Sequence, residues 1–358
     1  MTPEQFRALF PALRRTAWLD TPGSPPGALP VTEALRRAVE DWSSGEFDWL
    51  DWDGAVDECR ELFARFLGVA PGTVSAVGSL AEAVGTVAGS LPPGRVVLAE
   101  GEFRSNLLPW LAGHEVVTVP ARGGVTRTED LIAALDDRCA LLAVSELTSR
   151  DGHRHDLAAL RAATDRVGAR LFVNLTQSLG ALRFDPAVAP DYLAVHGYKW
   201  LLCPRGAAWL VTRPDRLDEL RPLAANWHAT PAPRGYFGAA RLAPDAARCD
   251  SSPAWFSWVG ARAALRIWLG VDPVRVEEHC LALAGRLAER AAELGFAQVG
   301  GASQIVVLRT DRPDRLTETL AAHRVRATVL GDRVRFGVHY FNDGSDVDAV
   351  LDALRDAG

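Results

Sequence analysis

Short apolar runs alternate with amphipathic segments through the middle of this chain, beginning near residue 74. The runs are too short for helices and are bounded by turn residues, so we predict strands buried on both faces at 95–99, 140–144, 170–173, 192–195 and 207–211. Amphipathic helices are predicted at 80–91 and 157–167. Strands that alternate with helices are joined by right-handed crossovers, so this pattern predicts an α/β fold with a mainly parallel sheet and helices on both faces.

The pattern differs toward both ends of the chain. A Gly/Pro-rich loop at 21–27 is followed by two predicted helices, at 31–42 and 56–67. Beyond residue 245 the chain predicts two long helices at 254–269 and 274–294, and then a strand, a helix, a strand pair and a closing helix at 305–308, 315–323, 326–338 and 346–354. We therefore expect an N-terminal segment 1–15, a large domain 16–245 and a small C-terminal α+β domain 246–358.

Composition and charge exclude several classes of protein. The net charge of -6 leaves no basic face for nucleic acid, and no uncharged apolar run approaches the length of a membrane span. Charged residues interrupt the first apolar segment, so no signal peptide is predicted and a cytoplasmic location is expected. The five cysteines are widely spaced, without CxxC pairs or Cys/His clusters, which predicts buried thiols and no metal site.

A single lysine stands among the basic residues. Of the 39 lysines and arginines only Lys199 is a lysine. An arginine stays protonated and cannot become a nucleophile, whereas a lysine amine can be neutralised by its surroundings and attack a carbonyl. We interpret Lys199 as a Schiff-base lysine; the alternative is chance survival of one lysine in an arginine-rich sequence.

Other polar and aromatic residues follow the predicted strands, at the sheet edge where such folds bind ligands. They are Phe103, Thr148, Asn174, Gln177 and the segment 196–199. In addition, Ser79 opens a helix after a short strand, and the free amides of that first turn suit a phosphate dianion, although an ordinary helix cap is the alternative. No G-x-G-x-x-G follows a strand, which disfavours a Rossmann dehydrogenase.

Two segments carry a resemblance to a known family. The segment 197–206, GYKWLLCPRG, resembles the lysine segment of the class V branch of fold-type I pyridoxal-phosphate enzymes, and 252–258, SPAWFSW, is similar to the carbon-sulfur lyases of that branch. The branch includes kynureninases, isopenicillin N epimerase-like proteins and cysteine desulfurases, and the resemblance runs from about Trp18 to the C-terminus. It implies the fold-type I architecture, pyridoxal 5'-phosphate as cofactor, an amino-acid substrate and a homodimer with shared active sites.

The resemblance also implies roles for individual residues. Lys199 would hold the cofactor and then act as general acid and base. The phosphate would be bound by the start of the helix at Ser79, Leu80 and Ala81, by Tyr198, and by Ser252 of a second subunit. His196 is also expected among the cofactor-binding residues. Phe103 would cover the ring face, unless it is a core residue, and Thr148 or Ser149 would approach the cofactor. Gln177 would bond the phenolic oxygen, Arg335 would bind the substrate α-carboxylate, and Trp227 would lie near the substrate.

Asn174 departs from the family pattern, which has an aspartate there. The aspartate keeps a proton on the pyridine nitrogen and makes the cofactor a strong electron acceptor, whereas an amide supplies no charge. Either the enzyme carries out chemistry that tolerates a neutral ring, or it binds cofactor and has lost ordinary turnover. No cysteine follows Cys280, which argues against a desulfurase with a persulfide loop. We expect a lyase that cleaves by β-elimination or in the manner of kynureninase, with an aminotransferase or an epimerase as alternatives.

Overall fold

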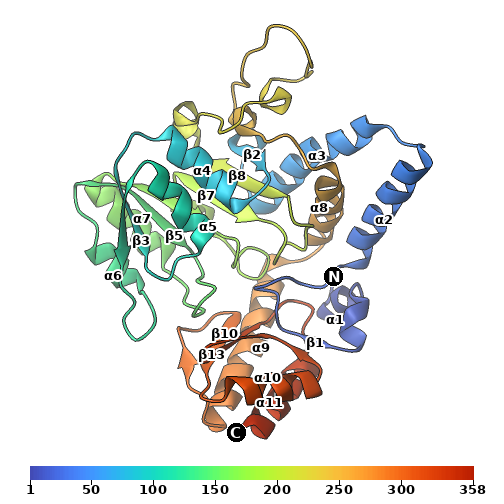
Figure 1. The fold of residues 1–358 in the computed structure, drawn as a ribbon, viewed down its shortest axis with the longest axis vertical. Helices are drawn as coiled ribbons and strands as arrows, with labels where there is room; N and C mark the ends of the chain where they lie inside the picture. Colours follow the sequence, from blue (N-terminus) through green and yellow to red (C-terminus); the bar gives the residue numbers. More distant parts are fainter.

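A seven-stranded sheet forms the centre of the computed structural model, which describes residues 1–358 (Figure 1). The strand order is β2-β8-β7-β6-β5-β3-β4. The strands are β2 (Val74–Val77), β3 (Arg95–Ala99), β4 (Glu115–Val119), β5 (Cys139–Ser145), β6 (Arg170–Asn174), β7 (Tyr192–His196) and β8 (Ala208–Thr212). The pairs from β7 to β4 are parallel, and only β8 runs antiparallel to its neighbours. The predicted α/β fold with a mainly parallel sheet is confirmed.

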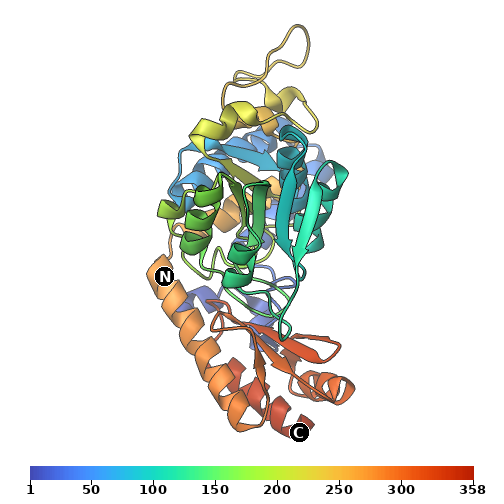
Figure 2. The same ribbon diagram turned by 90° about the vertical axis from the view of Figure 1, so that its left-hand side faces the viewer.

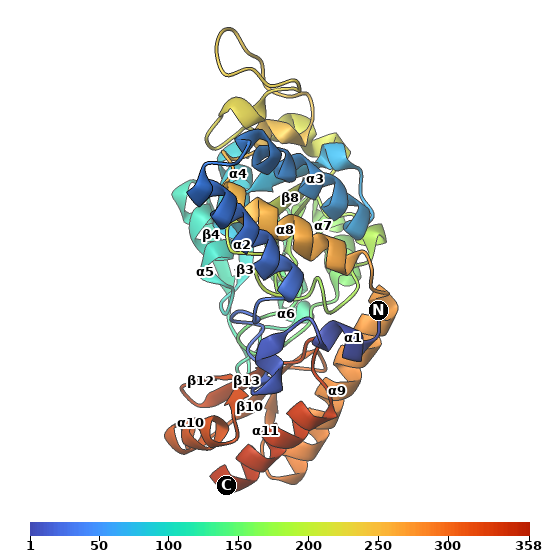
Figure 3. The same ribbon diagram turned by 90° about the vertical axis from the view of Figure 1, so that its right-hand side faces the viewer.

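Helices cover both faces of this sheet because its strands carry apolar side chains on both sides. Successive residues of β6 point to opposite faces: Leu171 and Val173 join one apolar cluster, and Phe172 joins the other. The larger cluster includes α2 (Leu29–Ser44), α3 (Trp49–Leu67), α6 (Thr128–Ala133), α7 (Leu157–Val167) and α8 (Trp255–Trp268). Figure 3 shows α2, α3 and α8 packed together. The opposite face is covered by α4 (Leu80–Ser90) and the region of α5 (Arg104–Leu107).

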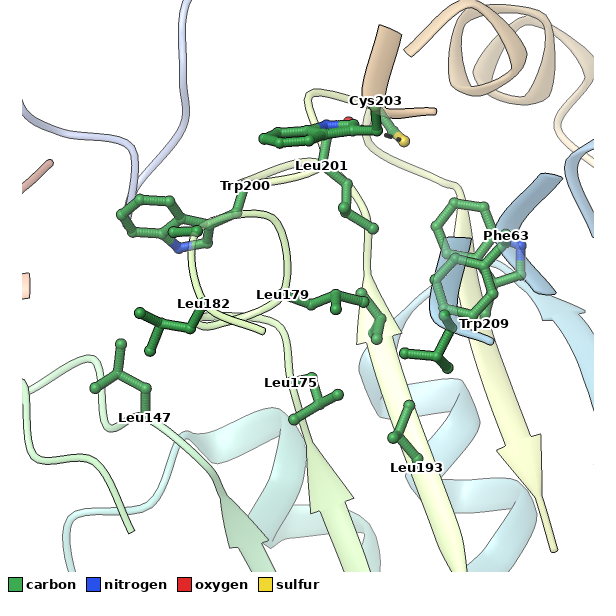
Figure 4. Packing of buried hydrophobic residues seen from close by; sticks show 14 of the residues in the cluster. Phe63, Leu147, Leu175, Leu179, Leu182, Leu193, Trp200, Leu201, Cys203 and Trp209 are labelled. Carbon is green, nitrogen blue, oxygen red and sulfur yellow. Dashed lines mark hydrogen bonds between the residues drawn. The ribbon is translucent and has the colours of Figure 1, made fainter. Parts of the chain in front are cut away.

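Tryptophans fix the helices and loops against the sheet. Trp209 of β8 stacks on Phe63 of α3, with ring centroids 4.3 Å apart and planes 2° from parallel (Figure 4). Trp200, on the loop after β7, is fully buried, and its indole nitrogen donates to the Gln177 side-chain oxygen at 2.9 Å. The stacking of Trp209 on Phe63 stabilises the fold by about 0.5–1.5 kcal/mol beyond the burial of apolar area. Trp200 is buried and hydrogen-bonded, so it fixes the loop that also carries Lys199.

A second, smaller sheet lies below the first in Figure 1. It is antiparallel in the order β12-β13-β10-β9, built from β9 (Gln298–Val299), β10 (Ile305–Arg309), β12 (Thr328–Leu330) and β13 (Arg333–Gly337). The helices around it are α9 (Pro273–Glu293), α10 (Pro313–Ala322) and α11 (Gly344–Ala357). Figure 2 shows α9 running along one side of this part, and its buried residues join both the large and the small apolar clusters. The predicted small α+β unit is present.

Three segments bear on the domain boundaries that we predict at residues 15 and 245. The strand β1 (Ala17–Trp18) pairs with β11 (Val325–Arg326), and Leu19 lies in the small apolar cluster. Both β1 and Leu19 nevertheless fall within the predicted large domain. The helix α8 packs on α2 and α3, and not on the C-terminal sheet, although it follows residue 245. The short helix α1 (Pro3–Arg7) contributes Phe6 to the large cluster. Apolar packing thus crosses both predicted boundaries, and their positions remain predictions.

None of the helices combines the length and apolar character that crossing a membrane requires. All five cysteines are buried free thiols, as the sequence predicts.

Candidate active site

A cavity of about 840 Å³ lies between the two sheets. One wall comes from residues at or after the carboxyl ends of β3, β5, β6 and β7, and the other comes from β10, β12 and β13. Six of the predicted site residues line it, five of them from the larger sheet: Phe103, Thr148, Asn174, Gln177 and Lys199. Arg335 reaches it from the C-terminal sheet. The expectation that residues following parallel strands meet at one edge therefore holds.

Lys199 follows β7 and presents its amine to this cavity. The residue is 7 % exposed, and no hydrogen bond or ion pair joins its amine to another residue. Burial, with a smaller effect from the positive charge of Arg335, lowers its pKa to about 7. Near neutral pH a large fraction of the amine is therefore unprotonated, which is the form that attacks a carbonyl.

Two aromatic rings lie close to the amine. The Lys199 nitrogen lies 5.6 Å from the ring centroid of Phe103 and 5.5 Å from that of Tyr198. Phe103 is 48 % exposed at the start of α5, so it is not a core residue. A large apolar ring exposed beside a buried amine is suited to covering a planar ligand.

Asn174 is held by hydrogen bonds at both ends of its amide. The Thr176 backbone N–H donates to its side-chain oxygen at 3.0 Å, which identifies that atom as the oxygen, and its nitrogen donates to the Ser145 hydroxyl at 2.9 Å. That hydroxyl donates in turn to the Glu102 carboxylate at 2.6 Å. Glu102 is 8 % exposed, and burial raises its pKa. Glu102 and Ser145 were not predicted from the sequence, although each lies just beyond the end of a predicted strand.

Arg335 joins the C-terminal sheet to the loop after β5. Its guanidinium donates to the Ser149 hydroxyl at 2.5 Å and to the Asp20 carboxylate at 3.5 Å. Gln177 donates to the same Ser149 hydroxyl at 3.0 Å. Of the two candidates in that loop, Ser149 thus contacts both predicted ligand-binding residues. The Thr148 hydroxyl instead donates to Asp151 within its own turn.

The start of α4 offers unpaired backbone donors. The Ser79 hydroxyl accepts from the Glu82 N–H at 3.2 Å, and the Glu82 carboxylate accepts from the Gly78 N–H at 2.8 Å. The amides of Leu80 and Ala81, at the first positions of the helix, donate to no other residue. Two free amides at the positive end of a helix dipole suit a bound phosphate, but these residues are outside the lining of the cavity.

Four predicted site residues also lie outside the cavity lining. His196 is buried behind Tyr198, with ring centroids 4.5 Å apart, and burial lowers its pKa to about 4. Trp227 packs against Tyr236 and Trp49, at 4.9 and 6.3 Å between centroids. Ser252 is exposed just before α8. The roles of His196, Tyr198, Trp227 and Ser252 stay predictions. That of Ser252 depends on a second subunit, and that of Trp227 depends on the substrate.

The two sheets, the buried lysine after β7 and the arginine from the smaller sheet define a fold-type I pyridoxal-phosphate enzyme. The Aminotransferase class-V family model matches residues 50–306, so the chain belongs to this family. It is 29% identical to the uncharacterized aminotransferase YcbU of Bacillus subtilis over 98% of this chain and 97% of that one. It is also 30% identical to a probable cysteine desulfurase of Methanothermobacter thermautotrophicus, over 62% of this chain and 59% of that one.

Solved structures show the same fold. The cystine C-S lyase C-DES, in complex with its product cysteine persulfide, superposes with a TM-score of 0.87 at 20% identity, covering 97% of this chain and 99% of that one. Another structure of C-DES holds glycine covalently linked to its pyridoxal-phosphate cofactor. The expected family is thus confirmed, and with it an enzyme that depends on pyridoxal phosphate.

The residues present fit this cofactor. Its aldehyde requires an uncharged amine, which Lys199 provides, and its phosphate requires donors such as the free amides of Leu80 and Ala81. The exposed ring of Phe103 is available beside the amine. Asn174 differs from the aspartate that the resemblance implies, since it brings no carboxylate.

Proposed function

We propose that this enzyme is a lyase that eliminates a substituent from the β-carbon of an amino acid. The observation that carries the proposal is Asn174, whose amide is fixed between Thr176 and Ser145 and places no charge at the edge of the cavity. Without that charge the site is less able to store an electron pair. Elimination is favoured because the departing β-substituent takes the pair away at once.

In this proposal, bound pyridoxal phosphate supplies an aldehyde that condenses with amines and a ring that withdraws electrons from the α-carbon. Leu80 and Ala81 would bind its phosphate, Phe103 would cover its ring, and Gln177 and Asn174 would face its polar edges. Arg335 would bind the substrate α-carboxylate with two parallel hydrogen bonds, which its planar guanidinium is shaped to form. Lys199, with a pKa of about 7, would remove the α-proton and return it to the leaving group.

The cysteines argue against desulfuration by an enzyme thiol. None of the five lines the cavity, and all are buried. Burial raises the pKa of Cys249 to about 12 and that of Cys203 well above its ordinary value. These thiols are therefore protonated and inert as nucleophiles at neutral pH. A desulfurase that passes sulfur to its own cysteine is disfavoured for this chain, in contrast to the probable desulfurase among its relatives.

The test is an assay of the reconstituted enzyme with β-chloro-L-alanine and L-cystine. We expect pyruvate and ammonia to form in equal amounts, and borohydride reduction to fix the cofactor on the peptide that contains Lys199. Transfer of the amino group to an added 2-oxo acid would establish an aminotransferase instead. Inversion at the α-carbon in deuterated water would establish an epimerase. A protein that binds cofactor but shows no spectral response to any amino acid would have lost catalysis.

A further inference from the structure

The outer part of the cavity carries positive charge that the proposed chemistry does not use. Its lining includes three arginines besides Arg335: Arg104, Arg150 and Arg333. The lining also includes three carboxylates, but each is already engaged. Glu102 accepts from Ser145, Glu100 accepts from the Ala121 N–H at 2.9 Å, and Asp332 pairs with Arg309 at 3.0 Å. The three arginines make no side-chain hydrogen bond to the protein, so the mouth of the cavity is left with a cationic surplus.

Arg333 is the most enclosed of these three arginines. Its side chain is 14 % exposed, one terminal nitrogen is buried without a partner, and its only acidic neighbour, Asp332, lies 3.6 Å away. The backbone of Gly124 closes over the guanidinium: a Cβ at residue 124 would lie 2.6 Å from the other terminal nitrogen. Gly124 has a φ of +91°, which favours glycine there in any case. Arg309 donates to the same Asp332 at 3.0 Å, so Arg333 shares its one counter-charge with a second arginine. A partly desolvated cation with so little compensation is costly, which makes an anionic ligand favourable.

Arg333 and Arg335 point to the same side of the C-terminal sheet. Both belong to β13, two residues apart, and side chains two apart on a strand share a face. Three of their four neighbours across the sheet also line the cavity: Val307 and Thr328 beside Arg335, and Leu330 beside Arg333. The fourth, Arg309 beside Arg333, lies outside the lining. The Cα atoms of residues two apart on a strand are about 7 Å apart. Arg333 is thus the next cation outward from the proposed α-carboxylate site.

We propose that Arg333 binds an anionic group on the substrate side chain, so that the enzyme prefers amino acids with a second acidic group. The inference rests on the proposed function, because it takes Arg335 as the α-carboxylate ligand. A carboxylate on the side chain would pair with the Arg333 guanidinium through a charge-assisted hydrogen bond. The corresponding amide has the same shape without the charge, and would leave the guanidinium unpaired.

The experiment titrates the reconstituted holoenzyme with two isosteric pairs, L-glutamate with L-glutamine and L-aspartate with L-asparagine, following the cofactor absorbance. We expect at least one acid to bind about tenfold or more tightly than its amide. In Arg333→Met the affinity for that acid should fall to the affinity for its amide, while the affinity for the amide stays unchanged. Arg333→Lys should give an intermediate affinity for the acid. The control is Arg122→Gln, which removes the same charge from an exposed site on the adjacent loop outside the cavity and should change nothing.

Each other outcome overturns a defined part of the proposal. Equal binding of acids and amides by the wild type would refute the acidic preference and leave the lyase proposal standing. If Arg333→Met lost pyridoxal-phosphate affinity while its acid-to-amide ratio stayed the same, Arg333 would be a phosphate ligand and the inference would be wrong. If no amino acid altered the wild-type spectrum, the proposed function would fail together with the inference. Arg335→Met should lower the affinity for acids and amides alike, which distinguishes its role from that of Arg333.

Discussion

Asn174 presents an uncharged amide to the cavity, and the Ser145 hydroxyl links that amide to the Glu102 carboxylate. The single hydroxyl proton of Ser145 goes to Glu102, and the oxygen of Ser145 accepts from Asn174. An aspartate at residue 174 would be unable to donate to that oxygen. The identity of residue 174 therefore affects both the electron demand of the site and the hydrogen bonding of Glu102.

Asn174→Asp should move the enzyme toward amino-group transfer. The new carboxylate would stabilise a proton on the ring nitrogen, so we expect transfer to a 2-oxo acid to rise about tenfold or more and the pH dependence of the cofactor absorbance to change. Rates of pyruvate formation and of amino transfer measure this balance in one assay. Asn174→Ala is the control, since it removes the amide without adding charge. Unchanged spectra and rates in the aspartate variant would show that residue 174 does not tune the cofactor.

Lys199 should destabilise the cofactor-free protein at low pH. Its pKa of about 7 in the fold lies below the ordinary value of 10.5, so the unfolded chain binds the proton more tightly. The cost is complete below pH 7 and disappears as the pH rises from 7 to 10.5. Lys199→Met should therefore raise the free energy of unfolding by about 2 kcal/mol or more at pH 6, and by much less near pH 10.

Urea unfolding of the cofactor-free variant and wild type at the two pH values measures this effect. Arg65→Met, on the exposed face of α3, is the matched control and should show no pH dependence. If Lys199→Met raised the free energy of unfolding by the same amount at pH 6 and pH 10, the lysine amine would not be desolvated.

At the scale of elements, one buried ion pair connects α3, β2 and the segment before α8. Arg60 of α3 binds the Asp250 carboxylate with both terminal nitrogens, and that carboxylate accepts from the Ala76 N–H of β2 at 2.8 Å. Burial raises the pKa of Asp250 to about 6. Removing one partner of such a pair leaves a buried charge without compensation.

Arg60→Met should therefore lower the free energy of unfolding by about 3–5 kcal/mol. Thermal and urea unfolding at pH 8, where Asp250 is ionised, would measure the loss. The double variant Arg60→Met/Asp250→Asn should recover part of it, because the unpaired charge is gone. If the double variant lost as much free energy of unfolding as the two single variants together, Arg60 and Asp250 would not depend on each other.

The sequence predicted elements better than it predicted their contacts. Continuous apolar runs revealed the buried strands, but β4, with a partly exposed face, and the short α6 lacked a strong enough pattern. The antiparallel direction of β8 was missed because hydrophobicity carries no strand direction. Lys199 was predicted because it is the only lysine, and Asn174 and Phe103 because they follow predicted strands and lie in segments that resemble the family. Glu102, Ser145 and Arg333 were missed because their roles depend on which side chains the fold brings together.

For the whole molecule, we expect a homodimer. The outer surface of α2 exposes Leu29, Val39 and Trp42, and Ser252, the residue expected to act in a neighbouring active site, is also exposed. Light scattering at micromolar concentration should give twice the 38.6 kDa of one chain. Trp42→Asp should shift the equilibrium toward the monomer if α2 contributes to the interface. A monomeric wild type that binds cofactor with full affinity would contradict the expectation of shared sites.

The single lysine also determines how the protein responds to proteolysis. A protease specific for lysine has one bond to cut, between Lys199 and Trp200, and both residues are buried against the sheet. Cleavage therefore requires local opening of this loop, and it yields two fragments, 1–199 and 200–358. Once the amine is covalently engaged, the protease no longer recognises the residue. Resistance to one commercial enzyme thus reports, on a single gel, both the opening of the active site and the fraction of chains that carry cofactor.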